Sequence, residues 1–140
     1  VAFWRPAAPA RAGNRYDSAY RLSWLASEPV PSPLGRAVLT RRGFGGRPGH
    51  AAQTGVTKLV VDFEGPALFG KGRNSGVAVD LVVARGRVVE QAAYPVVGRD
   101  GRWRLMLDVV PERGAVMDLR ATLVCCGAPL SETWLYQLQG

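Results

Sequence analysis

Long apolar runs are missing from this chain of 140 residues. No stretch of ~18 apolar residues occurs, which argues against a transmembrane helix and against membrane insertion. A charged segment followed by an apolar one and a small-residue cleavage site is also missing, so no signal peptide is visible. The chain begins with Val1 rather than Met, and we therefore expect a processed product or a fragment of a longer protein.

Histidine and cysteine are nearly absent. His50 is the one histidine and has no Ser or Cys close to it in sequence, which argues against a histidine-dependent catalytic triad. The two cysteines, Cys125 and Cys126, are adjacent; strand neighbours point to opposite faces, and a disulfide between them is strained. We expect one buried thiol and one partly exposed thiol, no disulfide framework, and no metal or organic cofactor.

Acidic residues are few: eleven Asp and Glu stand against 18 Lys and Arg, which gives a net charge of +7. Most of the excess lies in residues 1–50, where eight arginines meet only Asp17 and Glu28. A basic chain suggests a nucleic acid or an anionic surface as a partner, and the alternative is a basic, solvated face. Because no nucleic-acid motif is present, we expect no nucleic-acid partner.

Glycine (17) and proline (10) are plentiful, and both disfavour helix interiors. Hydrophobic residues make up 47% of the chain and charged residues 21%, which argues against intrinsic disorder. Apolar and polar residues alternate in many stretches, a pattern typical of half-buried strands. Four apolar rows are predicted to point inward: Tyr20, Leu22 and Trp24; Leu59, Val61 and Phe63; Trp103, Leu105, Leu107 and Val109; and Leu119, Ala121, Leu123 and Cys125. We predict an all-β protein, with strands over residues 18–25, 57–64, 77–83, 87–94, 102–109, 119–125 and 131–138 and a short apolar run around Val38.

The strands suggest three parts. Residues 56–140 hold about six strands, which suffices for a small immunoglobulin-like β-sandwich domain. Residues 42–55 are glycine-rich and aperiodic, and we predict a connector loop there. Residues 1–41 carry many aromatic side chains but too few strands to close a sandwich alone. We therefore predict that residues 1–41 are the last strands of a larger β-sandwich domain.

Few residues are candidates for a catalytic or ligand-binding role. Arg41, Arg42 and Phe44 border the glycine-rich segment; the phenyl ring suits stacking on a sugar, and the guanidinium groups can donate hydrogen bonds to hydroxyls. The alternative is a solvated linker. No residue is predicted to be catalytic or to bind a metal. Most acids alternate with apolar residues and are interpreted as solvated outer-face charges: Asp62, Glu64, Asp80, Glu90, Asp108, Asp118 and Glu132.

Several stretches are specific enough to compare with a known family. They are residues 1–9 (VAFWRPAAP), 19–24 (AYRLSW), 40–46 (TRRGFGG), 59–65 (LVVDFEG), 103–105 (WRL), 118–121 (DLRA) and 130–137 (LSETWLYQ). In these stretches the chain resembles the C-terminal part of the periplasmic glucan biosynthesis proteins G and D, which act on osmoregulated periplasmic glucans. The segment from Arg42 to Gly55 is shorter than in many members, which carry a longer insertion with aromatic residues there.

The resemblance implies a large N-terminal β-sandwich with a carbohydrate-binding cleft, followed by a small immunoglobulin-like domain. It implies a periplasmic location, a β-glucan partner with a β-1,2-linked backbone, and a membrane glucan synthase as a second candidate partner. Some members cleave or transfer such chains, and the full-length protein would do so by carboxylate acid/base chemistry. Their catalytic acids correspond to positions before Val1, so we expect the chain alone to be inactive. The alternative function is a non-catalytic module that docks onto the glucan or the synthase.

Overall fold

The computed structural model describes residues 9, 11–26, 30–47, 49–50 and 53–140. Contacts divide the chain into two units, Val1–Val30 and Pro31–Gly140. In the first unit, residues 11–26 form no helix or strand, and Tyr20 and Trp24 are exposed. The strand predicted over 18–25 is therefore wrong. The reason is that a strand needs a neighbour for its N–H and C=O groups, and the described part of this unit supplies none.

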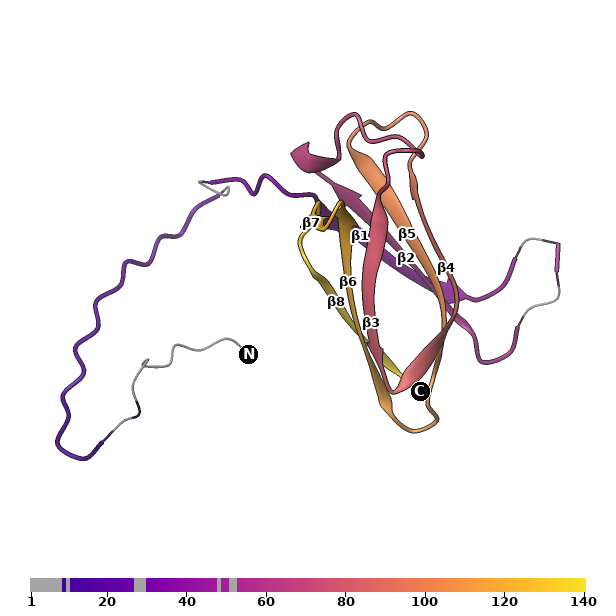
Figure 1. The fold of residues 1–140 in the computed structure, drawn as a ribbon. Coiled ribbons are helices and arrows are strands. Elements are labelled where there is room, and N and C mark those ends of the chain that lie inside the picture. Colours follow the sequence, from indigo (N-terminus) through magenta and orange to yellow (C-terminus); the bar gives the residue numbers. More distant parts are fainter. Residues whose placement is uncertain (1–8, 10, 27–29, 48, 51–52) are drawn as a thin grey trace. The chain divides into compact units, whose positions relative to one another are not determined.

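The second unit contains two antiparallel sheets that face each other (Figure 1). Sheet one has the strand order β1-β2-β5-β4. Its central strands, β2 and β5, pair along the whole of β2, with Leu59 opposite Leu107 and Phe63 opposite Trp103. The bounds are Arg36–Phe44 for β1, Thr57–Glu64 for β2, Gly86–Pro95 for β4 and Arg102–Pro111 for β5.

Sheet two is built around β6, which pairs with β3 on one side and with β7 and β8 on the other. The chain changes sheets between β2 and β3, again between β3 and β4, and finally between β5 and β6. A 3-10 turn at Pro66–Leu68 follows β2. The bounds are Ala78–Ala84 for β3, Val116–Cys125 for β6, Ala128–Pro129 for β7 and Trp134–Gln139 for β8.

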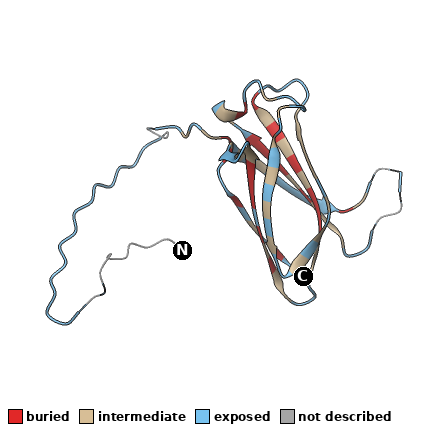
Figure 2. Ribbon diagram, in the orientation of Figure 1, coloured by how far each residue is buried: buried red, intermediate tan, exposed pale blue. Residues whose placement is uncertain are grey.

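The core lies between the two sheets and follows the predicted alternation. Figure 2 shows buried residues alternating with exposed ones along the strands. Burial of a large apolar side chain contributes about 1.5–3 kcal/mol, so these rows are the main source of stability. The core consists of Leu59, Val61, Phe63, Leu68, Trp103, Leu105, Leu107, Val109, Met117, Leu119, Ala121, Leu123, Trp134 and Leu138. The all-β sandwich is therefore confirmed, and so are the inward rows of β2 and β5; the row predicted over Tyr20, Leu22 and Trp24 is wrong, because these side chains are exposed.

The start of β1 is held by the segment between β7 and β8. Gly35 donates its N–H to Leu130 and accepts from the N–H of Glu132 (both 2.8 Å). The backbone also passes close to Gly65, where a Cβ would lie only 2.6 Å from the carbonyl oxygen of Leu34. These contacts fix β1 at the edge of sheet one while linking it to sheet two.

The observed strands differ from the predicted division at residue 41. Arg36–Phe44 form β1, which pairs with β2 in the same sheet, and residues 45–47, 49–50 and 53–56 belong to the loop of that hairpin. The division by contacts instead falls between Val30 and Pro31. Three expectations stay predictions: that residues 1–41 complete a larger domain, that residues 42–55 connect two domains, and that the sandwich is immunoglobulin-like. The described residues contain no helix long and apolar enough to cross a membrane.

Candidate functional site

Strand β1 carries the three residues predicted to contact substrate. Arg41 lies opposite Val60, Arg42 opposite Leu59, and Phe44 opposite Thr57. Since β1 is an edge strand, its side chains are covered on one side only. All three residues are exposed, and Phe44 is 95% exposed. An exposed phenyl ring at a strand end is available to a ligand.

The three residues do not share one face of the sheet. Arg42 and Phe44 alternate with Arg41, so they point to the side of the core residue Leu59, whereas Arg41 points to the outer face. Because Arg42 and Phe44 are exposed, the apolar interior ends before this part of β1. The structure therefore brings Arg42 and Phe44 to one side of the edge and places Arg41 on the other.

One charged cluster on the outer face of sheet one consists of two neighbouring cross-strand ion pairs. Arg104 on β5 binds Asp62 on β2 with two hydrogen bonds, of 2.7 and 2.9 Å, and Arg102 binds Glu64 beside it. Asp62 is only 1% exposed. Its pKa is lowered, first by the hydrogen bonds from Arg104 and also by the positive charges of Arg102 and Arg41, against the opposing effect of burial.

A second charged cluster holds the start of the β1–β2 loop. Asp108 on β5, 3% exposed, accepts from the N–H of Gly46 (3.1 Å) through Oδ2. Its Oδ1 lies 2.6 Å from Nζ of Lys58 and has no other partner among the described residues. Arg47 binds Glu90 with two hydrogen bonds, of 2.8 and 3.2 Å, which lower the pKa of Glu90. The loop is thus anchored just after Phe44.

A small cavity lies beside this anchor. Its volume is about 290 Å³, and it is lined by Arg47, His50, Gln53, Val89 and Glu90. His50 therefore lies near Glu90, but no hydrogen bond joins the two. No group of three or more His, Cys, Asp and Glu side chains in the described part of the chain is arranged to hold a metal ion.

The buried carboxylate of Asp62 does not suit proton donation. A general acid of a glycosidase needs a raised pKa so that it is protonated at neutral pH, whereas that of Asp62 is lowered. Asp108 is held by a cation and a backbone N–H. This arrangement can orient strands and a loop, and it keeps Asp62 ionised.

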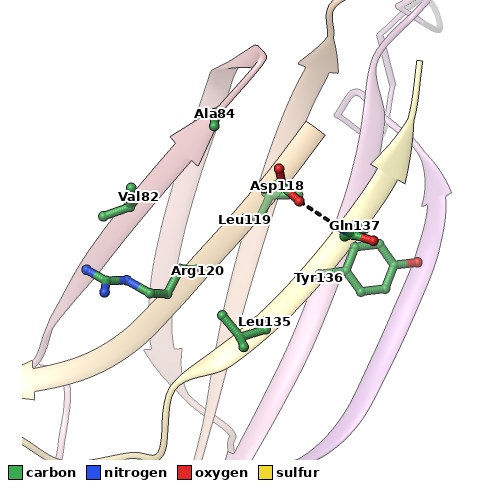
Figure 3. Close-up of a pocket in the computed structure, with 8 residues that line it drawn as sticks. All are labelled: Val82, Ala84, Asp118, Leu119, Arg120, Leu135, Tyr136 and Gln137. Atoms are coloured by element: carbon green, nitrogen blue, oxygen red, sulfur yellow. Dashed lines mark hydrogen bonds between the residues drawn. The ribbon is translucent and has the colours of Figure 1, made fainter. Parts of the chain in front are cut away.

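A larger groove, of about 730 Å³, lies on the outer face of sheet two. Figure 3 shows apolar Val82 and Leu135 beside Arg120 and the hydrogen-bonded pair of Asp118 and Gln137 (2.7 Å). Leu135 is 70% exposed. Such mixed lining suits a ligand with both apolar faces and hydroxyl or amide groups. The groove is lined by Val82, Ala84, Asp118, Leu119, Arg120, Leu135, Tyr136 and Gln137.

The interpretation of Asp62 and Asp108 as solvated charges is wrong. Both point away from the core, as the alternation predicts, but they sit on central strands and are covered by Arg104, Lys58 and the β1–β2 loop. A sequence signal did exist: aligning β2 with β5 places Lys58 opposite Asp108 and Asp62 opposite Arg104. The groove has no comparable signal, because no oppositely charged residues face each other where β3, β6 and β8 pair.

Known proteins resemble this chain over almost all of its length. Residues 1–138 match the family described as "Periplasmic glucan biosynthesis protein, MdoG". "Glucans biosynthesis protein D 2" of Ralstonia nicotianae is 45% identical over 141 residues, covering 98% of this chain and 26% of that protein. "Glucans biosynthesis protein G" of Cereibacter sphaeroides is 41% identical over 140 residues, covering 98% of this chain and 25% of that protein.

A relative from Xanthomonas axonopodis pv. citri, "Glucans biosynthesis protein D", is 38% identical over 141 residues. The chain spans about a quarter of the length of the curated relatives it matches. The similarity is therefore continuous along this chain and confined to one part of each relative. The chain belongs to the periplasmic glucan biosynthesis protein family.

Proposed function

We propose that this chain is part of a periplasmic protein that binds glucan chains with a β-1,2-linked backbone and, in its longer form, cleaves or transfers them. Membership of the glucan biosynthesis family supports the substrate class. The observation that carries the proposal for this chain is Phe44, 95% exposed at the end of an edge strand. An exposed ring that contributes nothing to the core is suited to stacking on a sugar.

Arginines flank this ring on both faces of β1. Arg42 lies on the side of Phe44 and supplies hydrogen-bond donors to sugar hydroxyls, while Arg41 lies on the outer face near Asp62. The anchoring of Gly46 to Asp108 and of Arg47 to Glu90 holds the chain just beyond the ring. A fixed backbone lowers the entropy lost when a ligand binds. Substrate contact by Arg41, Arg42 and Phe44 is thus the proposed role of the β1 edge.

Binding of linear β-1,2-glucan to the 140-residue chain, measured by titration calorimetry, tests this role. Phe44→Ala is expected to weaken binding about 10-fold, the effect of losing one ring contact. Phe69→Ala is the matched control, because Phe69 is also exposed but follows the opposite end of β2. Equal affinity of both variants and the unaltered chain would contradict the assignment.

Catalysis requires a separate measurement. We expect no release of reducing ends from linear β-1,2-glucan by the 140-residue chain and measurable release by a version extended toward its N-terminus. The catalytic pair of carboxylates needed for glycosidic cleavage is proposed to lie in that extension. Turnover by the 140-residue chain would place the acids within the sequence described here and contradict this part of the proposal.

The groove on sheet two favours a second candidate function, a non-catalytic docking module. Leu135 and Val82 are exposed apolar side chains in this groove, and a glucan synthase or the glucan itself is the proposed partner. In the longer protein, Leu135→Asp is expected to reduce glucan production in cells while glucan cleavage by the purified protein stays unchanged. Loss of both activities, or of neither, would contradict docking through this groove.

The positive charge does not favour nucleic acid as a partner. Several arginines are already bound to carboxylates, including Arg47, Arg102 and Arg104. A guanidinium already paired with a carboxylate is less available to a phosphate. We expect no complex with duplex DNA in a gel shift at low salt.

A further inference from the structure

Cys125 and Cys126 form a close pair of free thiols at the end of β6. Their sulfur atoms lie 3.5 Å apart. The expectation that they point to opposite faces is wrong, because only Cys125 belongs to the strand. Cys126 has a φ of 53° and Gly127 a φ of 80°, so the chain turns between β6 and β7 with two successive left-handed residues. This turn swings the second thiol to the side of the first.

The two thiols are held differently. The Cys125 thiol donates a hydrogen bond to the carbonyl oxygen of Ser75 (3.2 Å), and its pKa is raised by the contact with Cys126 and by burial, although the positive charge of Lys71 opposes this. Cys126 is exposed. A reagent can therefore reach Cys126 first and find the second sulfur already within reach.

The distance between the two sulfur atoms allows both of them to bond to the same third atom. With sulfur bonds of ~2.3 Å, as thiolates form with zinc, a 3.5 Å separation gives an angle of about 99° at the bound atom. That angle suits a pyramidal centre such as trivalent arsenic and does not suit a linear two-coordinate ion. A closed zinc site needs four ligands, and no cluster of three His, Cys, Asp or Glu occurs among the described residues.

We propose that Cys125 and Cys126 are a chelating dithiol site for trivalent arsenicals. With an arsenical of the form R–As=O, two As–S bonds form, the As=O bond breaks, and the oxygen leaves as water with the two thiol protons. The oxidation states of arsenic and sulfur do not change, so no oxidant or reductant takes part. The site is on sheet two and is independent of the proposed glucan contacts on β1.

Phenylarsine oxide is the probe. By intact mass, the 140-residue chain, reduced beforehand, is expected to gain the mass of one phenylarsine oxide less one water, and it is expected to lose both thiols in a thiol count. The adduct is expected to survive excess 2-mercaptoethanol and to be removed by a dithiol. An adduct that leaves with the monothiol would overturn the proposal, as would a chain that retains two reactive thiols.

Single substitutions separate chelation from simple thiol reactivity. Cys125→Ser and Cys126→Ser each leave one thiol in a turn of unchanged length, and both are expected to bind the probe at least ~100-fold more weakly, since the second bond is then lost. Circular dichroism confirms that each variant keeps its strands. Equal affinity in either variant would show that one thiol is enough and overturn the proposal. Zinc binding as tight as that of the arsenical would overturn the assigned ligand class.

Discussion

The central acids on the outer face of sheet one are buried in ion pairs, whereas outer charges of sheet two line an open groove. On sheet one, Asp62 and Asp108 are almost inaccessible and face Arg104 and Lys58 across neighbouring strands. On sheet two, Asp118 and Arg120 share a wide, solvated groove with exposed Leu135. Two faces of one sandwich with similar alternation therefore differ in whether a ligand can reach their polar groups.

This difference distinguishes charges that hold strands and a loop together from charges that a ligand can reach. Buried ion pairs add little net stability, because desolvation offsets attraction, but removal of one partner is costly. Those of sheet one also match the pairing of β2 with β5; a one-residue slip would turn each charge toward the core. The charges of sheet one thus match the strand register and hold a loop, while on sheet two Asp118 contacts only the partly exposed side chains of Arg85 and Gln137 among the described contacts and the groove stays accessible to solvent.

The largest effect is expected from Asp62→Asn. Losing the carboxylate leaves Arg104 without its counter-charge; since the Arg104 side chain is 30% exposed, part of its charge can be hydrated. We expect a loss of about 2–3 kcal/mol in the free energy of unfolding, measured with urea. Asp80→Asn, on the exposed outer side of β3, is the control and is expected to change it by less than ~0.5 kcal/mol. Equal losses of unfolding free energy in Asp62→Asn and Asp80→Asn would contradict the distinction between the two faces.

The same pair should be visible in the pH dependence of stability. Because the pKa of Asp62 is lower in the folded than in the unfolded chain, its contribution is complete above the ordinary aspartate value near 4 and is lost as pH falls through the folded value. The difference in unfolding free energy between the unaltered chain and Asp62→Asn is expected to be constant from about pH 6 to 7 and to shrink below about pH 4. A difference that grows on acidification would contradict the direction of the shift.

Asp108→Ala tests the second buried acid of sheet one. The substitution removes the acceptor for Gly46 and the partner of Lys58, so we expect a loss of about 1–2 kcal/mol. The loop between β1 and β2 is also expected to be cleaved faster by a protease with broad specificity. Glu112→Ala, at an exposed turn, should leave both unfolding and cleavage unchanged. Unaltered cleavage in Asp108→Ala would show that the loop is held by other contacts.

The sequence predicted sheet one better than it predicted the sites. Alternation identified Leu59, Trp103 and their neighbours as core, because a period of two is a local property. It failed over residues 18–25, where a strand pattern has no partner strand among the described residues. It also placed Asp62 in solvent, because burial on the outer face depends on which strand lies alongside. Exposure of Phe44 follows from β1 being an edge, which strand patterns alone do not reveal.

The smallest effect on stability, and the sharpest test of the open face, is expected from Leu135→Asp. Leu135 is 70% exposed and directed away from the core, so the free energy of unfolding should stay within about 0.5 kcal/mol of that of the unaltered chain. Val97→Asp, at a fully exposed turn, is the control for an added charge. A ligand seated in the groove would distinguish the two variants, since a carboxylate at position 135 must be desolvated on binding. A loss of several kcal/mol in Leu135→Asp alone would instead make this side chain structural and remove the contrast between the two faces.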